Sequence, residues 1–94
     1  MSLKDLEKKL GYYFNDISLL ELALIHKSSN NSSNNERLEY LGDSILTGVI
    51  SEYLFLKFPD EKEGKLTRMR SFLVKGETLT KKANELDLVM FIKL

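Results

Sequence analysis

Three carboxylates within eight residues are the side chains of this sequence best suited to chemistry: Glu36, Glu39 and Asp43. Residues 36–58 have apolar side chains at helical spacing and end before Pro59, so they predict one long helix. At about 100° per residue, the three carboxylates share one face of that helix. Glu39 repels Asp43 four residues later, and a hard divalent cation would relieve this repulsion.

The spacing alone leaves a second interpretation open, namely a solvated acidic face. Carboxylates in a first turn complement the positive end of the helix dipole, which accounts for Glu36 and Glu39 behind an Asn cap. It does not account for Asp43, which lies two turns into the helix.

The opposite face of the same helix is apolar and is predicted to point into the core. Its members recur at helical spacing, and they are Leu38, Leu41, Ile45, Val49 and Leu56.

The composition limits the class of protein and the number of domains. The chain has 94 residues, 43% of them hydrophobic, with no cysteine and a formal net charge of zero. This predicts one small globular domain without disulfides. No apolar run is long enough to span a membrane and no signal peptide is recognised, so a cytoplasmic location is expected.

The charge is segregated along the chain. Residues 36–64 carry seven acidic and three basic side chains, whereas residues 65–82 carry six basic and one acidic. Adjacent patches of opposite sign suit a metal ion and a polyanion together, and ordinary solvated helix faces are the alternative.

Further helices are predicted throughout, so the fold class is all-α. Residues 28–35 are only Ser and Asn and predict a loop. The apolar tail, residues 88–94, is interpreted as a segment that continues into more core. The other predicted helices span residues 3–10, 17–25 (capped by Asn15 or Asp16), 65–74 and 77–86.

Residues 35–44, Asn-Glu-Arg-Leu-Glu-Tyr-Leu-Gly-Asp-Ser, closely resemble the signature helix of the bacterial ribonuclease III family. Residues 10–14, 23–28 and 63–70 are also similar to segments of that family, in the same order. The resemblance implies the helical bundle of a ribonuclease III nuclease domain, with residues 1–94 as its N-terminal portion. The family's later helices, its second acidic motif and its double-stranded-RNA-binding domain have no counterpart in these residues.

The resemblance also implies functional roles for four acidic residues. Glu39 and Asp43 would be catalytic and hold Mg²⁺, with Mn²⁺ as an alternative, while Glu36 and Glu63 would be accessory acids lining the catalytic valley. The implied function is a Mg²⁺-dependent endoribonuclease that cleaves double-stranded RNA in rRNA and mRNA precursor processing. Half of the carboxylates are missing, so the isolated chain is expected to be inactive. The alternative is a non-catalytic dimerisation or RNA-binding module.

The family acts as a homodimer, and Tyr40 matches an aromatic residue that inserts into a pocket of the partner subunit, with Leu41 beside it at the interface. Without the resemblance, Tyr40 is interpreted as a half-exposed aromatic residue on a helix. No catalytic role is assigned to His26 or Ser44. The candidates for contact with the RNA backbone are Lys65, Arg68, Arg70 and Lys75.

Overall fold

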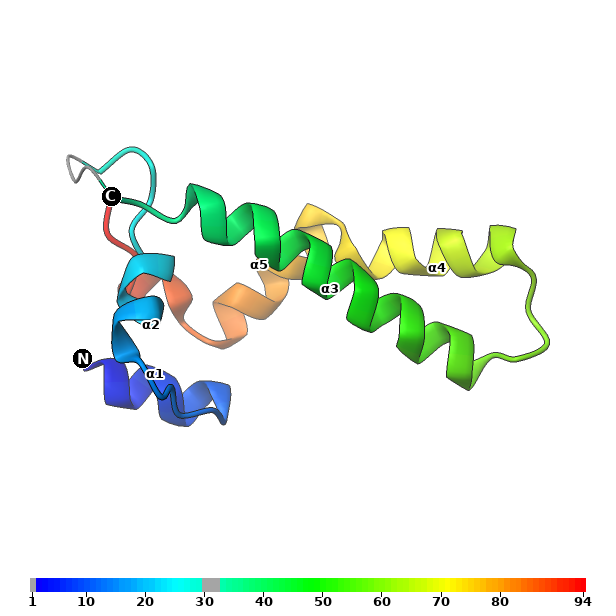
Figure 1. Cartoon of the computed structure of the whole chain (residues 1–94), viewed down its shortest axis with the longest axis horizontal. Helices are drawn as coiled ribbons and strands as arrows, with labels where there is room; N and C mark the ends of the chain where they lie inside the picture. Colours follow the sequence, from blue (N-terminus) through cyan, green and yellow to red (C-terminus); the bar gives the residue numbers. More distant parts are fainter. Residues whose placement is uncertain (1, 30–32) are drawn as a thin grey trace.

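The computed structural model describes residues 2–29 and 33–94, and the predicted all-α fold class is confirmed (Figure 1). In the described residues the only bridge between extended segments pairs Ile25 with Lys93. The middle of the predicted Ser/Asn loop lies outside the described residues. The helices are α1 (Leu3–Leu10), α2 (Ile17–Ala23), α3 (Glu36–Lys57), α4 (Glu63–Val74), α5 (Gly76–Glu85) and the 3₁₀ helix η1 (Leu88–Met90).

Helix α1 begins and ends as its sequence predicts. The Ser2 hydroxyl accepts a hydrogen bond from the backbone N–H of Asp5, and the Asp5 carboxylate accepts one from the Ser2 N–H. Gly11 ends the helix at φ 72°, a left-handed conformation that favours glycine. The buried carboxylate of Glu7 then accepts a hydrogen bond of 2.7 Å from the Phe14 N–H, which folds the next residues back onto α1.

One apolar cluster joins the two ends of the chain. Leu6, Leu20, Leu24 and Phe91 are buried together, so α1, α2 and the tail share this core. The tail also pairs with the end of α2, because the Lys93 N–H donates to the Leu24 carbonyl and the His26 N–H donates to the Lys93 carbonyl, both at 2.8 Å. The tail therefore closes this core through Phe91, while four other apolar residues of the tail stay exposed: Val89, Met90, Ile92 and Leu94.

Helices α3 and α4 form a long arm beyond that core. They pack side by side along the second half of α3 (Figure 1). The chain measures 47 × 26 × 24 Å and its radius of gyration is 15.6 Å. A compact domain of this length would have a radius of gyration of about 12 Å, so the arm is an extended part of the molecule.

The prediction that the apolar face of α3 points into the core is wrong. Leu41, Ile45, Val49 and Leu56 are all exposed. The buried Leu54 lies five turns after Glu36 and so points in the same direction as the acidic face, where α4 packs. Helical periodicity identifies which residues share a face, but it does not identify the face that a neighbouring helix covers.

The other helix boundaries differ from the prediction by only a few residues. Helix α2 ends at Ala23 rather than at residue 25, and α4 begins at Glu63 rather than at residue 65. Within the described residues, none of the helices is both long and apolar enough to cross a bilayer.

We expect Leu6→Ala to destabilise the fold by about 2–5 kcal/mol, because it removes a fully buried side chain from the cluster that joins the two ends of the chain. Thermal and denaturant unfolding measure the loss. Tyr13→Ala removes a large but exposed side chain, and it is the matched control. Equal effects of the two substitutions would contradict this location of the core.

The cap of α2 predicts a pH dependence. Hydrogen bonds from the Ser18 hydroxyl and backbone N–H lower the pKa of Asp16 below its ordinary value of 3.8. The stabilisation from the ionised cap is therefore present above that value and is lost as the pH falls through the folded-state pKa. We expect Asp16→Ala to be less stable than the parent at neutral pH and to converge with it in acid. A gap that persists in strong acid would contradict this account.

Candidate metal site and nucleic-acid interface

The beginning of α3 is held by its own loop and by the end of α2. The Asn34 side-chain oxygen accepts a hydrogen bond of 3.0 Å from the Glu36 N–H. The Asn35 side chain makes no cap hydrogen bond and instead donates to the Ala23 carbonyl at 2.9 Å. Its backbone N–H donates to the Ile25 carbonyl. The predicted Asn cap is thus supplied by Asn34, and Asn35 ties the helix to α2.

The carboxylates in the first half of α3 lie together as predicted. Glu36, Glu39 and Asp43 are exposed and line one hollow of about 620 Å³. Lys27, from the loop after α2, and Leu79, from α5, also line it. Sequence reasoning missed Lys27 and Leu79, because nothing in their local pattern indicates which helix they face.

The carboxylates fit a magnesium ion in part. Glu39 and Asp43 are one turn apart on a rigid helix, and Mg²⁺ binds through one or two carboxylates while keeping several waters. The described residues hold no group of three or more His, Cys, Asp or Glu side chains that could enclose an ion. Any cation held here would therefore take two carboxylate oxygens on an open surface rather than enter a closed cage.

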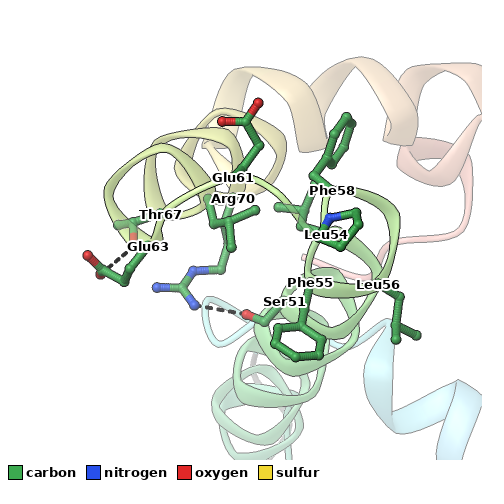
Figure 2. Close-up of a pocket in the computed structure, with 11 residues that line it drawn as sticks. Ser51, Leu54, Phe55, Leu56, Phe58, Glu61, Glu63, Thr67 and Arg70 are labelled. Atoms are coloured by element: carbon green, nitrogen blue, oxygen red, sulfur yellow. Dashed lines mark hydrogen bonds between the residues drawn. The ribbon is translucent and has the colours of Figure 1, made fainter.

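Glu63 lies outside the hollow that the other three acids line. It is in the first turn of α4, where its carboxylate accepts a hydrogen bond of 2.9 Å from the Thr67 hydroxyl. It lines a different hollow, between the second half of α3 and the first half of α4 (Figure 2). Within one copy of the chain, the structure does not bring Glu63 into the hollow that holds the acids of α3.

The four basic candidates divide into two groups. Lys65 and Arg68 line a shallow groove on α4 with the exposed ring of Phe72, and the Lys75 ammonium lies 4.4 Å from the centre of that ring. Arg70 instead donates a hydrogen bond of 2.8 Å to the Ser51 hydroxyl on α3. Only the first three share a surface where they could meet a polyanion.

Tyr40 is far more exposed than a half-buried helix aromatic. Its side chain is 79% exposed, and its neighbour Leu41 is also exposed. Both side chains lie on the same helix as the acids and are open to solvent.

Known proteins match this chain along almost its whole length. The sequence model described as Ribonuclease-III-like matches residues 16–94. Ribonuclease 3 of Marinomonas sp. (strain MWYL1) is 55% identical over 95% of the chain, and ribonuclease 3 of Vibrio campbellii is 53% identical over the same share. The chain belongs to the ribonuclease III family.

Solved structures agree with this ribonuclease III assignment. The chain superposes on two structures of the nuclease domain of ribonuclease III from Campylobacter jejuni, with TM-scores of 0.95 and 0.93 at 47% identity. One of them is described as showing structural flexibility in a region involved in dimer formation. These matches confirm the expected helical bundle of a ribonuclease III nuclease domain.

The ribonuclease III relatives are longer than this chain. The chain spans 39% of the length of both curated relatives, and 65% and 63% of the two solved nuclease-domain chains. The activity, substrates and partners of the whole protein are therefore proposals.

We expect Asn34→Ala to destabilise the chain by about 1 kcal/mol, because the Glu36 N–H loses its side-chain acceptor. Unfolding in denaturant measures the change. Asn15→Ala, at an exposed residue that does not cap α2, is the control. No difference between Asn34→Ala and the control would show that the cap does not stabilise α3.

Proposed function

We propose that this chain is the N-terminal portion of the nuclease domain of a cytoplasmic, Mg²⁺-dependent endoribonuclease that cleaves double-stranded RNA, including rRNA and mRNA precursors. The observation that carries this is the acidic hollow of α3, where Glu39 and Asp43 lie one turn apart in a chain of the ribonuclease III family. Exposed carboxylates on a rigid helix suit a hydrated cation next to a phosphodiester.

The residues of this chain would bind the metal ion and orient the water and the phosphate around it. Glu39 and Asp43 would hold Mg²⁺, or Mn²⁺ in its place. When bound, the metal supplies charge neutralisation at the phosphate and an activated water. The attack of water on phosphorus breaks the bond to the 3′ oxygen, which leaves 5′-phosphate and 3′-hydroxyl ends. Glu36 shares the hollow and would act on the waters around the ion, while Lys27 would attract the phosphate.

Binding to RNA would use charge and shape rather than base sequence. Lys65, Arg68 and Lys75 share one side of α4 and would contact phosphates. Arg70, whose guanidinium is turned toward α3, is the weakest of the four RNA-contact candidates.

The active protein would be a homodimer, with Tyr40 and Leu41 at its interface. Their exposure on the same helix as the acids supports this proposal. A non-catalytic dimerisation or RNA-binding module is the second candidate, and it is favoured by the absence, among the described residues, of a group of three metal-ligating side chains.

We expect Asp43→Asn to lower Mg²⁺-dependent cleavage of duplex RNA by at least 100-fold in the full-length protein, because an amide ligand lacks the charge that holds the metal. The measurement is the rate of cleavage of a labelled RNA duplex. Glu52→Gln neutralises an exposed carboxylate on another face of α3, and it should leave the rate within about twofold.

The two candidates give different results in this assay. Cleavage by the parent protein that Asp43→Asn abolishes would support the enzyme. Retained cleavage in Asp43→Asn would reject Asp43 as a metal ligand, and dimers that bind RNA but never cleave it would favour the non-catalytic module. The isolated 94-residue chain should show little or no hydrolysis, and strong hydrolysis would contradict its partial ligand set.

A further inference from the structure

The exposed side of α4 carries a shallow groove of about 420 Å³, which we call the α4 groove. Two cations, one aromatic ring and two other apolar side chains line it, namely Lys65, Arg68, Phe72, Met69 and Leu73. At about 100° per residue, Arg68 and Phe72 each lie roughly 160° around α4 from Arg70, which bonds to α3. The α4 groove is therefore separate from the hollow between α3 and α4.

Phe72 is the aromatic ring of this groove, and its side chain is 62% exposed. The Lys75 ammonium lies over the ring, 4.4 Å from its centre, so a cation covers one face of Phe72. The backbone below the ring is tied to α5, because the Phe72 carbonyl accepts a hydrogen bond of 3.0 Å from the Thr78 hydroxyl. Single exposed apolar side chains are common on proteins, so the cations around this ring, rather than its exposure, indicate a binding site.

The charge around the ring is positive and available to an anion. None of the described carboxylates lines the α4 groove, and none of them forms an ion pair with Arg68. Lys65 pairs with Glu61 at 3.2 Å, in an exposed contact within one helical turn. Lys75 pairs with Glu77 at 3.5 Å, and the Glu77 side chain is almost fully exposed. Exposed pairs of this kind contribute little stability, so a phosphate can replace either carboxylate.

A ring bordered by cations fits a ligand that combines an anion with a planar apolar face. Nucleotides have both parts, because the phosphate suits the basic side chains and the base suits the ring. Proteins that bind single-stranded nucleic acid use the same combination, in which bases stack on aromatic side chains and positive charge follows the backbone. The carboxylates of an acidic peptide match the charge, but they offer no planar apolar face to the ring.

The ring also distinguishes unpaired nucleotides from paired ones. Inside an RNA duplex each base is stacked between its neighbours, so its faces are closed to a side chain on the surface of a protein helix. A base in a loop, a bulge or a single-stranded end is open and can stack on an aromatic ring. Phosphates are available in both cases, so the basic side chains alone would not make this distinction.

We propose that the α4 groove binds an unpaired nucleotide next to the RNA duplex, with its base stacked on the free face of Phe72 and its phosphate against Arg68 and Lys65. This inference rests on the RNA binding of the proposed function and adds a preference for duplexes that are flanked by unpaired bases. The α4 groove contains none of the acids of α3. Phe72 would therefore select the RNA without touching the bond that is cleaved.

The test measures the binding of two RNA probes to the full-length protein by fluorescence anisotropy, without divalent cations so that neither probe is cleaved. Both probes contain the same duplex, and one carries a short oligoadenosine extension while the other carries an abasic extension of equal length and charge. We expect the parent to prefer the adenosine probe about tenfold, which is the contribution of one stacked base. Phe72→Ala should reduce this preference to less than about twofold. Tyr13→Ala removes a ring of similar exposure outside α4, and it should keep the preference.

Further substitutions separate stacking from apolar contact and from charge. Phe72→Leu keeps an apolar side chain without an aromatic face, and it should lose the preference as Phe72→Ala does. Phe72→Trp should keep it, and because these 94 residues contain no tryptophan, the new indole should be quenched by the adenosine probe and not by the abasic one. Arg68→Gln should weaken both probes alike and lower the salt dependence of binding, because it removes a phosphate contact. Circular dichroism of each variant checks that it is folded.

The outcomes separate this inference from the proposed function. A parent without the preference, or a preference that survives in Phe72→Ala or Phe72→Leu, would overturn the inference and leave the nuclease intact. An equal loss of both probes in Phe72→Ala would assign the ring to folding or to contact with protein, and would overturn it as well. A parent that binds neither probe would reject both the inference and the proposed RNA binding. The expected preference in a protein that never cleaves duplex RNA would uphold the inference and reject the enzyme.

Discussion

The constraint on which this structure depends is that one α-helix, α3, has to present several different surfaces along a single rod. With 3.6 residues per turn, only one row of side chains can face any given neighbour. Its first turns carry Glu36, Glu39 and Asp43 toward a hollow bounded by α5, and its later turns carry Leu54 toward α4. These two rows point in the same direction. The same face of α3 therefore carries the acids in its first half and packs against α4 in its second half.

Such an arrangement requires the start of α3 to be held from outside the helix. Neighbouring carboxylates repel one another, and little of the first half of α3 is buried to compensate. Hydrogen bonds, rather than buried side chains, hold the start of α3. Asn34 caps the Glu36 N–H, and Asn35 binds both Ala23 and Ile25. The pairing of Ile25 with Lys93 then connects this junction to the tail (Figure 1). The acids are therefore positioned by a junction of loops that is itself anchored to the core around Leu6.

Much of this was accessible from the sequence, and the exceptions have physical causes. The length of α3 and the shared face of its acids follow from helical periodicity, which is a local property. The apolar row with Leu41 and Val49 was wrongly predicted as core, because periodicity does not reveal what packs against a face. The roles of Asn35 and Arg70 were missed for the same reason, since each depends on a partner that is distant in sequence. The resemblance to ribonuclease III placed Glu63 with the other acids, but the fold of one copy holds it in another hollow.

That separation of Glu63 from the acids of α3 has a simple geometric consequence. Both hollows are lined by α3, and at 1.5 Å per residue about 22 Å of helix separates Tyr40 from Phe55. No rearrangement of side chains closes such a distance along a rigid helix, so Glu63 and the acids of α3 lie on separate surfaces within one copy of the chain.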